Sequence, residues 1–116
     1  MTYETIESTK GILTKTVFQD NEKITDYRTF FDALMESPSD TTIIEKNNIT
    51  PDFFNLKTGF AGEILQKVST YSRRLIILGD FSNVESKSLR DFMYESNSTG
   101  KVLFCETLEK AVSLLK

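Results

Sequence analysis

The chain has no histidine and no tryptophan, and only one cysteine, two prolines and five glycines among its 116 residues. Without histidine, it lacks the commonest general base of enzymes and cannot form a Ser-His or Cys-His nucleophile pair. Histidine and clustered cysteines are also the usual zinc ligands. We therefore predict no catalytic residue, no metal site and no cofactor.

Cys105 is the only cysteine, so no disulfide can form within the chain and a reducing compartment is favoured. Its place in the apolar run VLFC predicts a small core residue and not a reactive thiol. No apolar run approaches the roughly 20 residues of a membrane helix, and MTYETIESTK lacks the apolar segment of a signal peptide. We expect a cytoplasmic protein with no membrane partner.

The charge balance bears on the partners of the protein. The net charge is −3 and the pI is about 5.0. An acidic chain without a clustered basic stripe is a poor ligand for nucleic acid or for an anionic membrane. A protein partner, or a second copy of the chain, is the expectation that remains.

Runs rich in β-branched and aromatic residues predict strands at 2–7, 12–18, 41–45, 75–78 and 102–105. Helical spacing of apolar residues predicts a helix after the second strand and after each of the strands that follow it. Asp26 and Thr107 are the expected N-caps of the first and last helices, and Ser86 or Ser88 is expected to cap the third. Asp91 stands three residues after Ser88, as in a capping box.

The resulting element order is β-β-α-β-α-β-α-β-α, with a hairpin over 2–18 followed by βα units over 41–116. Single helices between strands imply right-handed crossovers and parallel pairing of the last three strands. Pro51 can open a helical turn, and the central helix is expected to begin near Thr58 or Gly59. The sequence therefore predicts one α/β domain, residues 1–116, with a mixed sheet.

Two stretches of the chain, PDFFNLKTGFAGEILQKVSTYSRRLIILGDFS and SKSLRDFMYESN, resemble the bacterial domain of unknown function 4180 family. The specific parts are Phe-Phe-x-Leu-x-Thr-Gly-x-Ala-Gly-Glu-Ile-Leu-Gln-Lys, Gly79-Asp80-Phe81, and Ser88-Leu89-Arg90-Asp91-Phe92 with Glu95-Ser96-Asn97. The resemblance extends over essentially the whole chain. It implies no activity, because the function of that family is unassigned.

The element order is also similar to the STAS domain of anti-sigma-factor antagonists and sulfate transporter tails. STAS domains carry a phosphorylatable Ser or Thr at the start of the helix after the third strand, in a Ser-Gly step. Thr58-Gly59 occupies the equivalent place here, although Leu56 and Lys57 replace the small polar residues of that family. The resemblance implies a STAS-like fold and makes Thr58 the candidate for phosphorylation.

The run 53–67 collects the unusual residues of the chain. Gly59 permits a sharp turn, whereas Gly62 in mid-helix costs about 1 kcal/mol relative to Ala and implies close packing or a contact. Phe53 and Phe54 are adjacent and cannot both point inward, so one of them is expected at an interaction surface or dimer contact. The predicted interaction surface comprises Phe53, Phe54, Asn55, Lys57, Thr58, Gly59, Glu63, Gln66 and Lys67.

A second candidate region lies where the parallel strands end, since ligands of open α/β sheets bind beyond the carboxyl ends of the strands. Asp80, Ser82, Asn83 and Arg90 are the polar residues expected at this ligand edge. Asp80 could act there as an acid, a base or a metal ligand, although no second carboxylate stands at a diagnostic spacing. Helix capping and turn formation are the alternative roles of Asp80.

The sequence leaves two functions open. The first is a non-enzymatic binding or regulatory module that acts through protein–protein contacts of the 53–67 surface. The alternative is a small-ligand binder or enzyme that uses the cleft at the strand ends, with Asp80, Glu63 and Arg90 as its polar groups.

Overall fold

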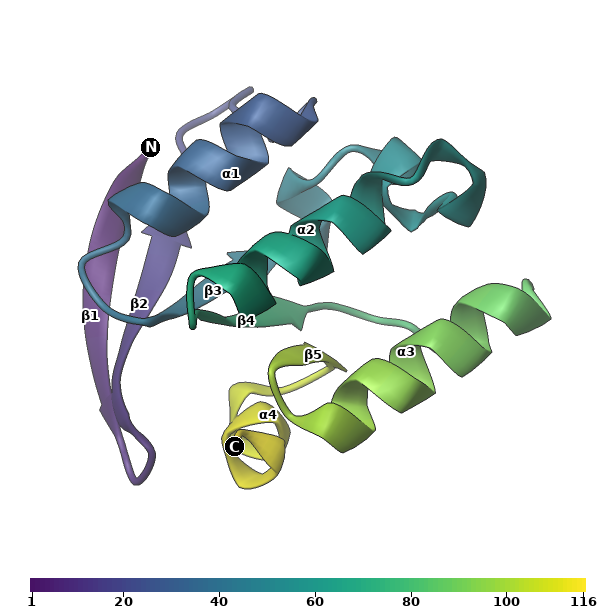
Figure 1. Cartoon of the computed structure of the whole chain (residues 1–116). Helices are drawn as coiled ribbons and strands as arrows, with labels where there is room; N and C mark the ends of the chain where they lie inside the picture. The colour runs from purple at the N-terminus through teal and green to yellow at the C-terminus, as the bar shows by residue number, and fades with distance from the viewer.

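The computed structural model describes all 116 residues and contains five strands and four α-helices in the order that the sequence predicts. The elements are β1 (Thr2–Ser8), β2 (Gly11–Val17), α1 (Tyr27–Glu36), β3 (Thr41–Glu45), α2 (Phe60–Thr70), β4 (Arg74–Leu78), α3 (Lys87–Thr99), β5 (Val102–Cys105) and α4 (Leu108–Leu114) (Figure 1). The prediction of a single α/β domain with a mixed sheet is therefore confirmed.

The strands follow one another across the sheet in the order β1-β2-β3-β4-β5. β1 and β2 form the predicted antiparallel hairpin, and β3, β4 and β5 are parallel as expected. β2 also pairs in parallel with β3, so the parallel part of the sheet extends one strand further than the sequence indicated.

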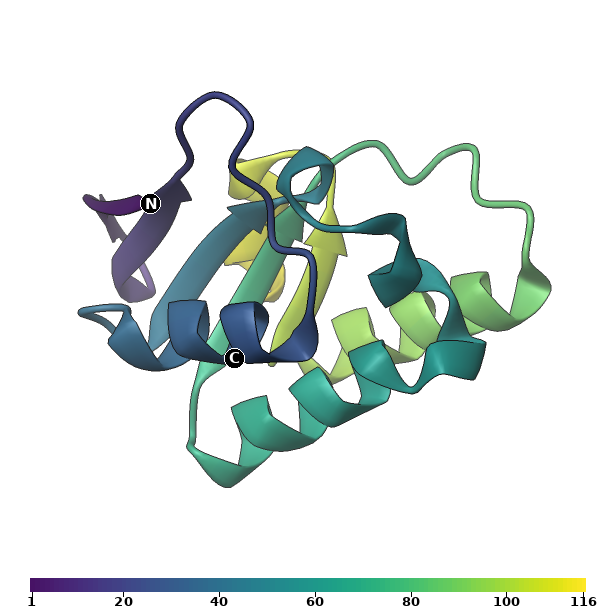
Figure 2. The ribbon, with the colours of Figure 1, turned by 90° about the horizontal axis from the view of Figure 1, so that it is seen from above.

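The helices divide unequally between the two faces of this sheet. α1, α2 and α3 lie on one face and α4 lies on the other (Figure 2). The larger core cluster contains side chains of the first three helices, such as Phe30, Ile64 and Met93, whereas the smaller one contains Ala111 of α4. Cys105 belongs to the smaller cluster and is buried as predicted, and burial raises the pKa of its thiol.

Three helices begin at the polar residues that the sequence indicates. Side-chain oxygens of Asp26, Ser86 and Thr107 each accept the backbone N–H three residues further along the chain, at 2.8 to 3.2 Å. The predicted capping box with Asp91 is wrong, because Ser86 takes the cap position and Asp91 pairs instead with Lys87 at 2.7 Å.

Side chains of α3 close the outer edge of β5. The Asn97 amide donates to the Phe104 carbonyl at 3.1 Å, and its oxygen accepts the Phe104 N–H at 2.7 Å. The Ser96 hydroxyl donates to the Val102 carbonyl at 2.5 Å. These two residues thus supply the backbone of β5 with the hydrogen bonds that a further strand would otherwise provide.

Replacing Asn97 tests this closure. Asn97→Ala should lower the free energy of unfolding by about 2 kcal/mol, because two half-buried backbone groups of Phe104 lose their partners. Urea denaturation measures the effect. Asn83→Ala is the control, since the Asn83 side chain is exposed, and equal unfolding midpoints for the two variants would contradict the closure.

Candidate functional site

The segment between β3 and α2 forms one flank of the site and is built from three short 3-10 turns. They span Lys46–Asn48, Pro51–Phe54 and Leu56–Thr58. Pro51 opens the second turn as predicted. Gly59 ends the third turn at φ +77°, a left-handed conformation that glycine adopts without strain, and α2 begins at the next residue.

The adjacent phenylalanines of this segment point in different directions. Phe53 has no exposed area and stacks on Phe30 with ring centroids 5.1 Å apart. The prediction that Phe53 belongs to the interaction surface is therefore wrong. Phe54 is half-buried and meets the ring of Phe81 at 6.1 Å between centroids, so it is the member of the pair that reaches the surface.

No other part of the chain packs against Gly62. A Cβ built on Gly62 would meet no atom within 4 Å, and the residue is exposed on the outer face of α2. The helix packs inward through Ala61, Ile64 and Val68 instead. Of the two explanations that the sequence leaves for Gly62, close packing within the domain is therefore excluded.

The remaining residues of the predicted surface lie on the last turn of the segment and on the outer face of α2. Six of them are exposed and Lys67 is half-buried; the six are Asn55, Lys57, Thr58, Gly59, Glu63 and Gln66. A hollow of about 300 Å³ lies beside them, and its lining includes three carboxylate residues, Asp26, Asp52 and Glu63. This end of the surface is therefore acidic.

Thr58 holds the start of α2 although it is exposed. Its hydroxyl is placed to donate to the carbonyls of Asp52 and Asn55, at 3.0 and 2.9 Å. The same oxygen accepts the N–H of Phe60 at 3.2 Å. A kinase could reach this side chain, but phosphorylation would replace the donated hydrogen and would add negative charge beside the acidic hollow.

Asp80 shapes the turn after β4. Its carboxylate accepts the Ser82 N–H at 2.9 Å and the Ser82 hydroxyl at 2.6 Å. These bonds, with a smaller contribution from the charge of Lys46, lower the pKa of Asp80 below its ordinary value. An acid or base poised for neutral pH needs the opposite shift, so the geometry fits turn formation.

Apart from Ser82, the members of the predicted ligand edge do not converge on Asp80. Arg90 donates to the carbonyls of Val84 and Glu85, at 3.0 and 2.8 Å, and so ties the loop before α3. Asn83 is exposed. Glu63 stands on α2, and no hydrogen bond or ion pair joins any two of Asp80, Glu63 and Arg90.

Lys46 is a residue of the strand-end region that the sequence analysis did not single out. Its ammonium group donates to the Asp80 carbonyl at 2.6 Å and lies 5.0 Å from the centre of the Phe81 ring. A side chain at Gly79 would exclude it, since a Cβ there would stand 2.5 Å from the Lys46 Cβ. Gly79, the glycine directly after β4, is the sequence feature that indicated this close approach of the Lys46 side chain to the backbone.

Phe54, Phe81 and Lys46 join the two predicted regions into one rim along the carboxyl ends of the strands. A second hollow, of about 410 Å³, adjoins Phe54 and is lined by Lys23, Lys46, Asn47, Ile49, Pro51 and Phe54. Lysines give this end of the rim a positive character, opposite to that of the hollow beside Thr58. The arrangement can hold apolar and charged groups, but it presents no set of convergent catalytic groups.

Comparison with known proteins places most of the chain in one family. The model of the family described as Domain of unknown function (DUF4180) matches residues 8–115. None of the curated proteins and none of the solved structures matches the chain, so the STAS-like topology is not confirmed by a related structure. The domain has no helix long and apolar enough to cross a bilayer, and no cluster of three or more Cys, Asp or Glu residues suited to a metal.

Thr58→Ala tests the hydrogen bonds that the hydroxyl makes at the start of α2, where Gly59 is the N-cap residue. The loss of the acceptor for the Phe60 N–H should lower the free energy of unfolding by about 1 kcal/mol, measured by urea denaturation. Thr58→Ser keeps the hydroxyl and should retain most of that stability. An alanine variant as stable as the serine variant would show that these hydrogen bonds contribute nothing.

Ser82→Ala tests the origin of the lowered pKa of Asp80. The Asp80 pKa should rise toward the ordinary value of about 3.9 when the hydroxyl is lost, and NMR titration of the carboxyl carbon measures it. Because the folded-state pKa is depressed, the stability that this turn contributes is present above roughly pH 4 and is lost as the pH falls through the folded pKa. Asn83→Ala should leave the titration unchanged, and an unmoved Asp80 in Ser82→Ala would contradict the assignment.

Proposed function

Because the chain belongs to the family of the Domain of unknown function (DUF4180), whose description assigns no activity, we propose a function from the geometry of its own surface. The protein is a non-enzymatic binding or regulatory module that acts by contact with a protein partner. We call the contact region the recognition surface, and it comprises Phe54, Asn55, Lys57, Thr58, Gly59, Gly62, Glu63, Gln66 and Lys67.

The exposed Gly62 is the observation that carries the proposal. A glycine at a solvent-facing position inside a helix lowers stability by about 1 kcal/mol relative to alanine. Nothing within the chain occupies the space where a side chain would lie. An external backbone or side chain that approaches α2 closely at this point accounts for the missing Cβ.

The two hollows support a protein partner over a small molecule. The acidic one contains Asp26 and Glu63, and the lysine-rich one contains Lys23 and Phe54. The segment before α1 runs parallel to the segment after β3 at the bridge between Ile24 and Ile49, and residues before and after Ile24 line different hollows: Lys23 the lysine-rich one, and Thr25 and Asp26 the acidic one. A small ligand fills one hollow, whereas a polypeptide can place an apolar anchor against Phe54 and charges of opposite sign at both ends.

Phosphorylation of Thr58 is the regulatory mechanism that the STAS resemblance suggests. Thr58 is exposed, which supports access by a kinase. A phosphate on its hydroxyl would break the hydrogen bonds that this group donates to the carbonyls of Asp52 and Asn55. Carboxylates at Asp52 and Glu63 would repel the added charge. On this proposal, phosphorylation loosens the start of α2 and weakens the contact with the partner.

The alternative function is a small-ligand binder at the strand ends. The hollow of about 410 Å³ that Lys46, Asn47 and Phe54 help to line favours it. A ligand of that hollow would be an anion with an apolar body. Saturable binding of such a compound, abolished by Lys23→Ala but not by Gly62→Ala, would favour this alternative over a protein partner.

Gly62→Ala separates stability from binding, because the two should change in opposite directions. The variant should be more stable by about 1 kcal/mol, since alanine is the better helix former. It should also capture less of the partner, since the new methyl group occupies the contact point. Calorimetry or urea denaturation measures the first effect, and quantitative affinity capture from the native host with the full chain as bait measures the second.

Phe54→Ala and Thr58→Glu should likewise reduce capture of the same partner. Tyr94→Ala is the matched control, because Tyr94 is a largely exposed aromatic residue on α3, outside the recognition surface. Identical partners in identical amounts for the wild type, Gly62→Ala and Phe54→Ala would overturn the proposal.

A further inference from the structure

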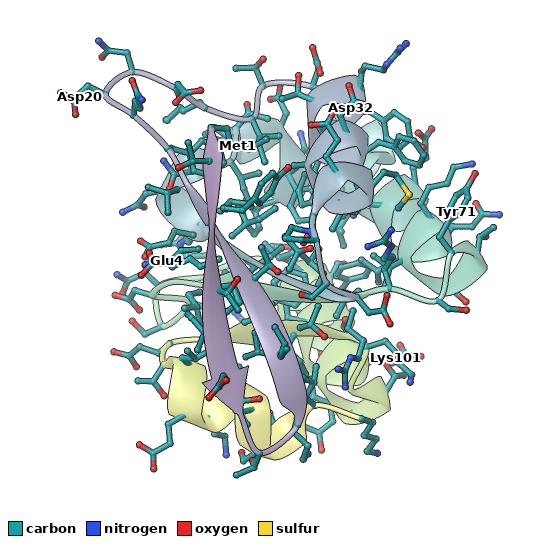
Figure 3. All side chains as sticks on the ribbon, turned by 90° about the vertical axis from the view of Figure 1, so that its left-hand side faces the viewer. Met1, Glu4, Asp20, Asp32, Tyr71 and Lys101 are labelled. Atoms are coloured by element: carbon teal, nitrogen blue, oxygen red, sulfur yellow. The ribbon has the colours of Figure 1, made fainter.

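β1 leaves one edge of the sheet open. It is the outermost strand at one end of the sheet, and its backbone groups have no backbone partner outside the ladder with β2. The strand is seven residues long, and its register with β2 is unbroken from Thr2–Val17 to Ser8–Gly11. Figure 3 shows β1 along the outside of the molecule, with no other segment in front of it.

Most of the devices that usually protect an edge strand are absent from β1. Its sequence, TYETIES, contains no proline and no lysine, and its regular register leaves no room for a bulge. The opposite edge of the same sheet is closed by Ser96 and Asn97. One edge is therefore protected by specific side chains, whereas the other keeps a regular ladder of free donors and acceptors.

The hairpin geometry fixes which backbone groups point outward. The hairpin closes on the pair Ser8–Gly11, and hydrogen-bonded pairs of an antiparallel ladder alternate with non-bonded ones. Alternate residues counted back from Ser8 bond to β2. The N–H and C=O groups of Tyr3, Thr5 and Glu7 consequently face away from the sheet.

We propose that β1 pairs antiparallel with β1 of a second copy of this chain, around a two-fold axis at Thr5. The axis stands perpendicular to the sheet, so the two sheets become continuous and each face of one copy continues into the same face of the other. Thr5 then faces its own equivalent, and Tyr3 faces Glu7. On the other face, Glu4 lies opposite Ile6 and Thr2 lies opposite Ser8.

The acidic residues of β1 select this register and make a second copy a fitting partner. With the axis at Thr5 every residue of β1 has an opposite residue, and neither Glu4 nor Glu7 faces a carboxylate. An axis at Glu4 would set the two Glu4 side chains directly opposite each other, which is destabilising. An axis at Ile6 would leave Thr2 and Tyr3 of both copies unpaired.

The test uses the position that lies on the axis. Thr5 is exposed, so Thr5→Glu and Thr5→Lys should each fold normally, which circular dichroism melting checks. Each variant alone should place like charges opposite each other and shift the dimer to monomer by at least about tenfold in Kd. Sedimentation velocity over a concentration series measures the shift for the full chain.

An equimolar mixture of the two variants should restore the dimer, because only an axis at Thr5 sets the new carboxylate of one copy against the new ammonium group of the other. Thr9→Glu is the control, since Thr9 is exposed in the hairpin turn beyond the ladder, and it should dimerise as the wild type does. Hydrogen exchange of the Thr5 amide should also slow as the wild-type concentration rises.

Three results would overturn the proposal: a wild type that stays monomeric at all concentrations, a dimer that survives in both single variants, or a mixture that does not re-associate. Phe54→Ala should leave the dimer intact. This variant keeps the test distinct from that of the recognition surface, because a dimer lost only with Phe54→Ala would assign self-association to that surface instead of β1.

Discussion

The right-handed crossover between parallel strands decides which face of the sheet three of the four helices cover. Each crossover from β2 to β5 steps in the same direction across the sheet, so α1, α2 and α3 must all lie on one face (Figure 2). The same constraint brings the segments that follow β3 and β4 to one rim. Phe54 and Phe81 are distant in sequence and meet at this rim.

A sheet whose strands are added in one direction has two edge strands. In this domain the backbone of one edge strand is hydrogen-bonded by side chains, and that of the other is not. At β5, the side chains of Ser96 and Asn97 take the place of a neighbouring strand. This role explains Ser96 and Asn97 of the Glu-Ser-Asn run in physical terms, without any catalytic assignment. At β1 no such side chain exists, and an open ladder of seven residues is large enough for strand pairing with another copy.

The sequence allowed the element order, the helix caps and the burial of Cys105 to be predicted, because each depends on local patterns. Asp26 and Thr107 cap where the hydrophobic spacing begins. The parallel pairing of β2 with β3 could not be derived, since β2 is also half of a hairpin and its other neighbour depends on the direction of the first crossover.

The candidate site was less predictable, because it depends on orientations that adjacent residues do not reveal. Which of the two rings, Phe53 or Phe54, is buried depends on the 3-10 turn, which directs Phe53 onto Phe30. Lys46 was missed because a lysine after a strand resembles any solvated residue, and its place depends on Gly79, which follows the neighbouring strand β4. Gly62 drew attention as a glycine inside a helix, but the sequence could not show that no atom of the domain lies where its side chain would be.

The two proposed contacts are compatible, and together they have a further consequence. α1 separates β1 from α2 (Figure 1), so strand pairing at β1 would leave the recognition surface of each copy uncovered. A two-fold axis perpendicular to the sheet also keeps both α2 helices on the same side of the joined sheet. Two recognition surfaces would then face the same direction, and a partner with two matching segments would bind by avidity with no new contact. Loss of the β1 pairing should therefore weaken capture of a bivalent partner while the affinity of each single surface stays unchanged.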